Sequence, residues 1–540
     1  MKKILLLLSV VLCGSWAMAQ SVADLSELEG QSCTSIMVGK RASADGSVIT
    51  SHTCDGRYRT WMHIEPAANH QKGAVHRVLR GTMHTAYYGD TTGVKLMGTL
   101  PQIQHTYAYL NAAYPCLNEK QLSIGETTFG GPDVLVNEKG WFTIEELERI
   151  ALQRCDNARA AIRLIGSLVS KYGYGDGGEC ITIADKNEVW QMEILGEGPK
   201  KVGGVWAAQR IPDDHVGVSA NIPRIGRLQR NNPNYFMCSD NIEKVAIANG
   251  LWDGKGEFIF WKVFNCDYAN GKNFREREYF ILNALAPSLH LSMDMDSLPF
   301  SVKPDKNVDV QQVMELLRST YDGTDMDMCQ NIKMVTSRKN QDGTTYLDTI
   351  VSPLANPWMS GVMEKTLNYI QPGTVTFRRT VSVAWCSYSF VAQLRDWLPD
   401  AVGGVCWVAL DNPGQSPRVP VFCGTTRMPA TYDVCGQHGY NEKAAIWKFR
   451  KANKLATVQW QRTRDLMEKE RATAQNAAFD GLSKLEKEIA AIHNGNGSET
   501  DKNRQIEHLL NDYTFHQYDV AVDAWQRLES RFWSMFSMGF

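Results

Sequence analysis

The feature that most constrains the fold is a series of short strand-like segments that follow one another without helices between them. These segments cover residues 180–183, 189–194, 205–209 and 216–220. They come directly after a stretch from Thr143 to Tyr172 whose apolar residues recur with helical spacing, and Thr143 with Glu146 fits a capping box at its start. Because grouped strands flanked by helices lack regular strand–helix–strand alternation, this order predicts an α+β fold built of layers.

The rest of the chain contains strand-like, helical and mixed regions. Strand-like residues return at 374–385 and 404–410, whereas the chain from about residue 442 is helical and charged, with one break at 493–498. The region from about 250 to 375 is mixed in pattern and is interpreted as an irregular insertion. We therefore expect a main domain over residues 33–440 and a helical extension over residues 441–540.

The N-terminus has the pattern of a targeting segment. Two lysines precede a short apolar run at residues 4–12, and Ala-Met-Ala at 17–19 supplies the small-x-small pattern of a signal-peptidase site. The run is far shorter than the roughly 20 apolar residues that span a bilayer, which disfavours a membrane anchor. The pattern predicts a signal peptide at 1–19, a leader at 20–32, and export to the periplasm or the cell exterior without membrane insertion of the mature chain.

Charge and cysteine content exclude several other classes of protein. The formal net charge of −2 argues against binding to duplex nucleic acid, which requires a basic face. None of the 13 cysteines forms a CxxC pair, so neither a zinc ribbon nor a thioredoxin-like site is indicated. Most cysteines are expected to be small buried residues. The sequence allows one or two disulfides but does not pair the cysteines.

Cys33 is the main candidate for a nucleophile, because it follows the polar leader directly. If the mature chain begins at Cys33, its α-amino group, with an ordinary pKa of about 7.7 to 8.0, can take the proton of the thiol. Asp45-Gly46 predicts a two-residue hairpin turn, which would place Cys33 near residues 57–58. Asp55 would lie near the same end of the hairpin, where a carboxylate could orient the free amine.

The stretch CTSIMVGKRASADGSVITSHTCDG, residues 33–56, resembles the opening of the C69 dipeptidase family. Similar motifs follow in order at residues 118–131, 190–228 and 378–389, and the resemblance extends to about residue 430. The family comprises N-terminal-nucleophile hydrolases related to penicillin V acylases and bile salt hydrolases. The resemblance implies a four-layer αββα sandwich over residues 33–440, a thiol peptidase acting on dipeptides, and neither a cofactor nor a metal.

The resemblance also implies roles for individual residues. Cys33 matches the nucleophile, and Asp55 matches the acidic residue that supports its amine. Asn221 resembles an asparagine of the oxyanion region, and Thr127 or Thr128 falls near the other contributor to that region. Small peptides are the implied substrates.

One position departs from the family pattern. Where the family has Arg-Asn-Glu-Asp, this chain has His-Thr-Cys-Asp, so His52 replaces the arginine expected near the thiol. A histidine is often neutral at pH 7 and lacks the bidentate geometry of a guanidinium. Either His52 takes a partial role, or another basic residue such as Arg57 or Arg379 supplies the charge.

Alternative functions remain open from the sequence. An amidase of the same fold could act on acyl amides, such as penicillin V, bile-salt conjugates or N-acyl amino acids. The aromatic content, with 15 Trp, 19 Tyr and 18 Phe, would also suit a non-catalytic surface binding protein. Histidines are frequent in the N-terminal third, but the HExxH motif of a metal site does not occur. The sequence permits autocatalytic removal of the leader, and the apolar faces of the helical extension would suit a homo-oligomer.

Overall fold

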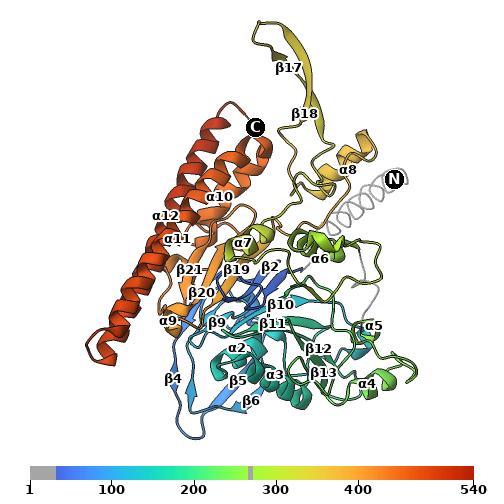
Figure 1. Cartoon of the computed structure of the whole chain (residues 1–540), viewed down its shortest axis with the longest axis vertical. Coiled ribbons are helices and arrows are strands. Elements are labelled where there is room, and N and C mark those ends of the chain that lie inside the picture. The colour runs from blue at the N-terminus through green and yellow to red at the C-terminus, as the bar shows by residue number, and fades with distance from the viewer. Residues whose placement is uncertain (1–31, 265–271, 540) are drawn as a thin grey trace, which may run out of the picture.

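The computed structural model describes residues 32–264 and 272–539. The signal peptide predicted at 1–19 and all but the last residue of the leader lie outside the described residues. Within them the protein is a mixed structure of helices and several antiparallel sheets, which confirms the predicted α+β class. Figure 1 shows two large central sheets with helices around them and a bundle of long helices along one side.

The first large sheet has seven strands in the order β16-β14-β1-β2-β19-β20-β21. Its strands are β1 (Ser35–Val38), β2 (Val48–Asp55), β14 (Val216–Ser219), β16 (Ser301–Val302), β19 (Cys386–Leu394), β20 (Gly404–Leu410) and β21 (Val419–Phe422). Every residue of β1, β2 and β19 is buried, so these strands lie in the centre of the molecule. The predicted strand at 404–410 is confirmed as β20.

The second large sheet has eight strands in the order β15-β13-β12-β11-β10-β9-β8-β3. Its strands are β3 (His63–Glu65), β8 (Tyr109–Asn111), β9 (Leu117–Asn118), β10 (Ser123–Thr128), β11 (Glu179–Ala184), β12 (Val189–Gly196), β13 (Gly204–Arg210) and β15 (Phe236–Cys238). The four consecutive strands predicted between residues 180 and 220 are confirmed as β11 to β14. The fourth, β14, leaves its neighbours and joins the seven-stranded sheet beside β1.

Side chains of the two large sheets meet face to face. The hydroxyl groups of Thr50 on β2 and Thr182 on β11 lie 2.8 Å apart, and those of Thr127 on β10 and Ser219 on β14 lie 2.5 Å apart. The helices α2 (Ile144–Arg154) and α3 (Ala158–Tyr172) contact the eight-stranded sheet. The helices α6 (Lys272–Leu285) and α7 (Val310–Leu317) contact strands of the seven-stranded sheet.

The predicted capping box at the start of α2 is wrong. Thr143 is the N-cap residue, but its side chain makes no capping hydrogen bond. Glu146 instead lies 2.8 Å from His76 Nε2 and accepts a hydrogen bond from Arg149. His76 and Arg149 therefore bind the carboxylate that a capping box would use.

Several short elements surround the two sheets. They are α4 (Ile242–Ala248), α5 (Phe260–Val263), α8 (Gly361–Ile370), α9 (Asp400–Gly403) and the strand pairs β4 (Ala68–Asn69) with β7 (His105–Thr106), β5 (Val75–Arg80) with β6 (Lys95–Pro101), and β17 (Lys333–Lys339) with β18 (Thr345–Val351). The β17–β18 hairpin extends away from the main body, as Figure 1 shows. It belongs to the predicted irregular insertion, as does α8.

The C-terminal helices are α10 (Ala445–Val458), α11 (Trp460–Asn494) and α12 (Glu499–Met535). The break predicted at 493–498 is confirmed between α11 and α12. Trp525, Leu528 and Phe532 are buried along one face of α12, which packs beside α10, α11 and β21. Among the helices that the structure describes, none combines the length and the apolarity needed to cross a bilayer.

The strand predicted at residues 374–385 is wrong. These residues form an irregular segment, and β19 begins only at Cys386. Val381 and Val383 are buried, and the backbone N–H of Ser382 donates to Ser319, so packing on neighbouring loops accounts for the apolar pattern.

The predicted register of the first hairpin is also wrong. Thr34 faces Thr53, so Cys33 lies opposite Cys54 instead of near residues 57–58. The error leaves Cys33 one position from Asp55, closer than the sequence suggested.

A long connection between β1 and β2 explains this register. The backbone N–H groups of Arg41 and Ala42 both donate to the carbonyl oxygen of Asp213, which holds the connection against another loop. The carboxylate of Asp45 accepts hydrogen bonds from the backbone and hydroxyl of Ser47. Asp45-Gly46 is therefore the end of a longer loop and not a two-residue turn.

Candidate active site

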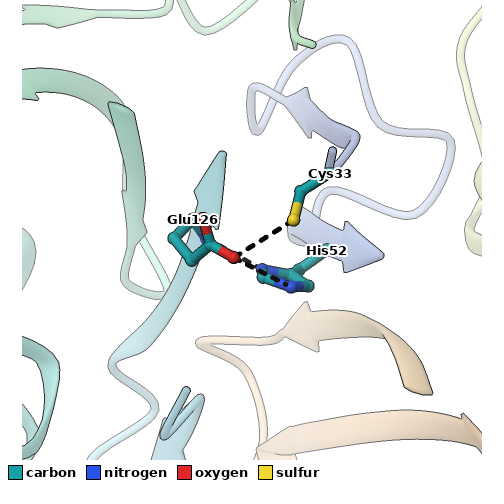
Figure 2. A group of neighbouring side chains, drawn as sticks. All are labelled: Cys33, His52 and Glu126. Carbon is teal, nitrogen blue, oxygen red and sulfur yellow. Dashed lines mark hydrogen bonds and ion pairs between the residues drawn. The ribbon is translucent and has the colours of Figure 1, made fainter. Parts of the chain in front are cut away.

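Cys33 lies two residues before β1 and is buried, with 1% of its surface exposed. Its thiol donates a hydrogen bond to Glu126 Oε1 on β10, over 3.2 Å. Its backbone N–H donates to Asn221 Oδ1, over 2.9 Å. The sulfur of Cys33 therefore lies beside the carboxylate of Glu126, as Figure 2 shows. The side-chain amide of Asn221 lies beside the backbone nitrogen of Cys33.

Burial and the nearby carboxylate of Glu126 raise the pKa of the Cys33 thiol well above its usual value. In the described state, where Ser32 is still joined to Cys33, the sulfur is thus a protonated thiol. A thiol is a far weaker nucleophile than a thiolate, so this state requires a proton acceptor before it can react.

Asp55 is held by two donors at the end of β2. Its Oδ2 atom accepts hydrogen bonds from Arg379 Nη2 over 2.7 Å and from Thr53 Oγ1 over 2.9 Å. Its Oδ1 atom is buried and has no hydrogen-bond partner among the described residues. One carboxylate oxygen therefore remains for another donor near the backbone of Cys33.

Arg379 also binds the residue that precedes the nucleophile. Its Nη2 atom donates to the carbonyl oxygen of Ser32 over 3.0 Å and to its hydroxyl over 2.7 Å. The backbone N–H of Ser32 donates to the carbonyl oxygen of Asp55 over 3.2 Å. The structure thus brings Arg379 and Asp55 together around the peptide bond that joins the leader to Cys33.

His52 does not supply the positive charge of the arginine that it replaces. Complete burial lowers the pKa of His52 to about 3, so its ring is neutral. The ring stacks on Phe390, with centroids 5.7 Å apart. Its Nδ1 atom accepts a hydrogen bond from the backbone N–H of Glu126 over 2.9 Å, so the proton of the ring resides on Nε2.

This tautomer bears on metal binding. The donor atoms of Cys33, His52 and Glu126 lie within 4.8 Å of one another, as a metal site would require. The lone pair of the neutral imidazole is already used by the Glu126 amide, and Nε2 carries a proton. These three residues therefore fit a hydrogen-bonded group better than a metal-binding group.

Arg277 on α6 is a buried residue of the site that the sequence did not reveal. Its guanidinium donates to the carbonyl oxygen of Cys33, to Thr34 Oγ1 over 2.8 Å and to Asn221 Oδ1 over 2.8 Å. Burial lowers the pKa of Arg277 to about 9, which leaves it charged at neutral pH. By contrast, Arg57 is exposed at the end of β2.

Asn221 has a left-handed backbone conformation, with φ of 62°, which is uncommon for a residue other than glycine. Its side chain accepts from the Cys33 amide and donates from Nδ2 to the carbonyl oxygen of Thr128 over 2.5 Å. The Thr127 hydroxyl contacts Ser219 instead, and the Thr128 hydroxyl points to carboxylates. Asn221 thus lies between Cys33 and the backbone of Thr128, whereas the hydroxyl of Thr127 is used between the sheets.

Glu126 and Glu179 form a buried pair of carboxyl groups beside the sulfur. The Thr128 hydroxyl lies 3.4 Å from Glu126 Oε2 and 3.3 Å from Glu179 Oε2. Burial raises the pKa of Glu126 to about 7 and raises that of Glu179 as well. The sequence contained Glu126 in the GETT motif, but nothing in the strand pattern distinguished it from its neighbours.

Known proteins are similar to this chain over most of its length. A family model described as peptidase family C69 matches residues 32–473. A probable dipeptidase of Latilactobacillus sakei is 28% identical over 421 residues, which cover 75% of this chain and 77% of that protein. A probable dipeptidase of Salmonella dublin is 26% identical over 410 residues, which cover 73% of this chain and 81% of that protein. A probable dipeptidase B of Lactococcus lactis is 25% identical, over 75% of this chain and 78% of that protein.

Proposed function

The chain belongs to peptidase family C69 and is a hydrolase that acts as a peptidase, and from this premise we propose that it is an exported dipeptidase whose nucleophile is an N-terminal Cys33. The observation that carries the proposal is the environment of Cys33. Its nitrogen, its sulfur and its carbonyl oxygen each contact a polar side chain that suits amide hydrolysis, and these side chains come from three separate segments of the chain. The names of the similar proteins support dipeptides as the substrates.

The proposed reaction begins after the leader has been removed. The α-amine of Cys33 takes the proton of its own thiol, and the sulfur attacks the carbonyl carbon of the scissile amide. Asn221 lies beside Cys33, where its amide group suits the oxyanion region. The amine of the departing amino acid takes the proton as the carbon–nitrogen bond breaks, and water then hydrolyses the thioester.

The proposed fold is the αββα sandwich of N-terminal-nucleophile hydrolases, over residues 33–440, with a helical extension over residues 441–540. Its support is the contact of the two large sheets through threonine and serine hydroxyls, with α2 and α3 on one sheet and α6 and α7 on the other. In such a sandwich the nucleophile belongs to a central strand, and Cys33 lies two residues before β1, which pairs with β2 and β14.

The leader is proposed to be removed by Cys33 itself. Its sulfur attacks the carbonyl carbon of Ser32, and Arg379 donates to the carbonyl oxygen on which negative charge develops. Glu126 accepts the thiol proton, since it already accepts the thiol hydrogen bond. As the peptide bond breaks, the nitrogen of Cys33 takes up the proton that the thiol gave to Glu126, which frees the amine and leaves a thioester. Water then hydrolyses the thioester and releases the leader with a carboxylate on Ser32.

The test combines intact mass with hydrolysis of unmodified dipeptides. Protein recovered from the periplasm or medium of an expressing bacterium is expected to begin at Cys33 and to release free amino acids from dipeptides. The Cys33→Ala variant is expected to keep its leader from residue 20 and to be inactive while folded, as circular dichroism would show. An active protein that retains Ser32 would overturn the mechanism, and a Cys33→Ala variant trimmed before residue 33 would overturn self-cleavage.

A further inference from the structure

We propose that Glu126, supported by Glu179, binds the α-ammonium group of the substrate and so selects peptides with a free N-terminus. The inference rests on the proposed dipeptidase reaction and goes further, because it assigns the buried carboxyl pair to a substrate group. It also distinguishes a dipeptidase from an amidase of acyl amides, whose substrates lack this ammonium.

Distance from the nucleophile is the first reason. Glu126 Oε1 lies 3.2 Å from Cys33 Sγ, as Figure 2 shows. A carbonyl carbon ready for attack lies about 3 to 3.5 Å from the sulfur, and the α-nitrogen of a dipeptide is only one carbon further along. An ammonium group in that position is within hydrogen-bond reach of Oε1, whereas an acyl amide has only hydrogen or carbon there.

Charge balance is the second reason. Glu126 and Glu179 have at most 1% of their surface exposed. Glu126 Oε1 lies 3.5 Å from His52 Nε2, and no Lys or Arg among the described residues forms an ion pair with either carboxyl group. The imidazole of His52 is neutral, and the nearby Arg379 pairs with Asp55. Glu179 Oε1 is buried and has no hydrogen-bond partner among the described residues. Burial favours the protonated form of these carboxyl groups, and a bound ammonium would stabilise the ionised form in its place.

The two roles of Glu126 occur at different stages. While Ser32 is attached, the nitrogen of Cys33 is an amide and cannot act as a base, so Glu126 is the proton acceptor beside the thiol. Once the amine of Cys33 is free, it takes over the thiol proton. Glu126 Oε1 then becomes available to the substrate.

The experiment compares two substrates of the same shape in mature protein. L-Alanyl-L-alanine carries the ammonium, and propionyl-L-alanine has hydrogen in its place. Wild-type protein is expected to prefer alanyl-alanine by roughly 100-fold in kcat/KM, and Glu126→Gln is expected to reduce this preference by about 10-fold or more, since charged hydrogen bonds contribute about 1.5 to 3 kcal/mol. The reduction should come mainly from a higher KM for alanyl-alanine.

The matched control is Glu148→Gln. Glu148 is a buried carboxyl group on neighbouring α2, and neither of its oxygens has a hydrogen-bond partner among the described residues. This variant is expected to keep the substrate preference of the wild type. Alkylation of Cys33 by iodoacetamide, measured in both variants, separates loss of thiol reactivity from loss of ammonium binding. If Glu126→Gln retains its leader, the comparison uses chains that begin Met-Cys33, from which the initiator methionine is removed during expression.

The outcomes separate the inference from the proposed function. Equal losses on both substrates in Glu126→Gln, or equal wild-type activity on both, would overturn the ammonium site and leave the peptidase mechanism standing. Wild-type cleavage of propionyl-alanine alone would favour the acyl-amide amidase. Mature protein that cleaves neither these nor other dipeptides would contradict the proposed function itself.

Discussion

The Asp55 carboxylate and the Arg379 guanidinium lie 2.7 Å apart, although 324 residues separate them in the chain. Both groups are buried; the guanidinium donates to Ser32, and the backbone carbonyl oxygen of Asp55 accepts from the Ser32 N–H. An ion pair in the interior has a large desolvation cost and is stable only with further hydrogen bonds. Here those bonds come from Thr53 and from the residue that precedes the nucleophile.

The first prediction concerns this pair and maturation. Arg379→Lys keeps the charge but loses the planar fork that contacts Asp55 and Ser32 together. We expect precursor to accumulate, with leader removal slowed by about 10²-fold, as for loss of an oxyanion donor. Intact mass followed over time after a pulse of expression measures the rate. Removal at the wild-type rate would contradict a role for Arg379 in cleavage.

The second prediction concerns Arg277 in the mature enzyme. Arg277→Lys retains a cation but cannot hold the Cys33 carbonyl, Thr34 and Asn221 at once. We expect kcat on dipeptides to fall by roughly 10²-fold with a smaller change in KM, because the geometry of the oxyanion region is disturbed. Steady-state kinetics measure this split. A change confined to KM would place Arg277 in substrate binding instead.

The third prediction concerns His52. Restoring the family arginine by His52→Arg inserts a cation into a pocket formed by the rings of Tyr114, Tyr388 and Phe390. We expect loss of roughly 1 to 3 kcal/mol of stability from overpacking alone, and no gain in activity. Urea denaturation gives the free energy of unfolding, with His52→Gln as the neutral control. A stable and more active His52→Arg protein would contradict the neutral role assigned to this ring.

The fourth prediction concerns pH and the Glu126 carboxyl. Burial raises the pKa of Glu126 from its ordinary value of 4.5 to about 7, so folding favours its protonated form. Stability from this group is complete below pH 4.5 and declines as the pH rises to 7. The full difference corresponds to roughly 3 kcal/mol.

We therefore expect Glu126→Gln, made in an inactive Cys33→Ala background, to be more stable than its parent at pH 8 and similar at pH 4.5. Urea denaturation of both proteins at the two pH values measures the difference. Identical pH profiles would show that the carboxyl group is not protonated by burial.

The fifth prediction concerns the helical extension. Trp525 on α12 is fully buried, and its indole N–H donates to Asn453 Oδ1 on α10 over 2.8 Å. We expect Trp525→Ala to lower stability by about 3 to 5 kcal/mol. Trp533→Ala, at a position that is 51% exposed, is the matched control and should have a much smaller effect. Equal effects in thermal unfolding would show that α12 does not pack on the domain in solution.

The positions of strands β11 to β14 along the chain could be predicted from the sequence, but the sheet to which each strand belongs could not. The pattern at residues 180–220 identified β11 to β14 because alternation and turn residues are local signals. The transfer of β14 to the other sheet depends on its pairing with β1, nearly 180 residues earlier in the chain. Buried valines in the segment 374–385 resembled a strand because burial alone, without pairing, favours the same residues.

The candidate site was predicted in part for similar reasons. Cys33, Asp55 and Asn221 were chosen from the leader and the family resemblance, and the structure brings all three close together. Arg277 was missed because it lies on a helix within the irregular region, where no periodic pattern marks a buried charge. Glu126 was missed because only the position of the sulfur makes one buried glutamate differ from another.

The contact of Arg379 with Ser32 has a kinetic consequence in the proposed scheme. Because the leader and the nucleophile belong to one chain, maturation would be a unimolecular event whose half-time does not change on dilution. A finished molecule would not be needed to process its neighbours, because each precursor already holds its own sulfur and the Ser32 carbonyl together. Each precursor chain would thus activate only itself, in a single intramolecular cleavage.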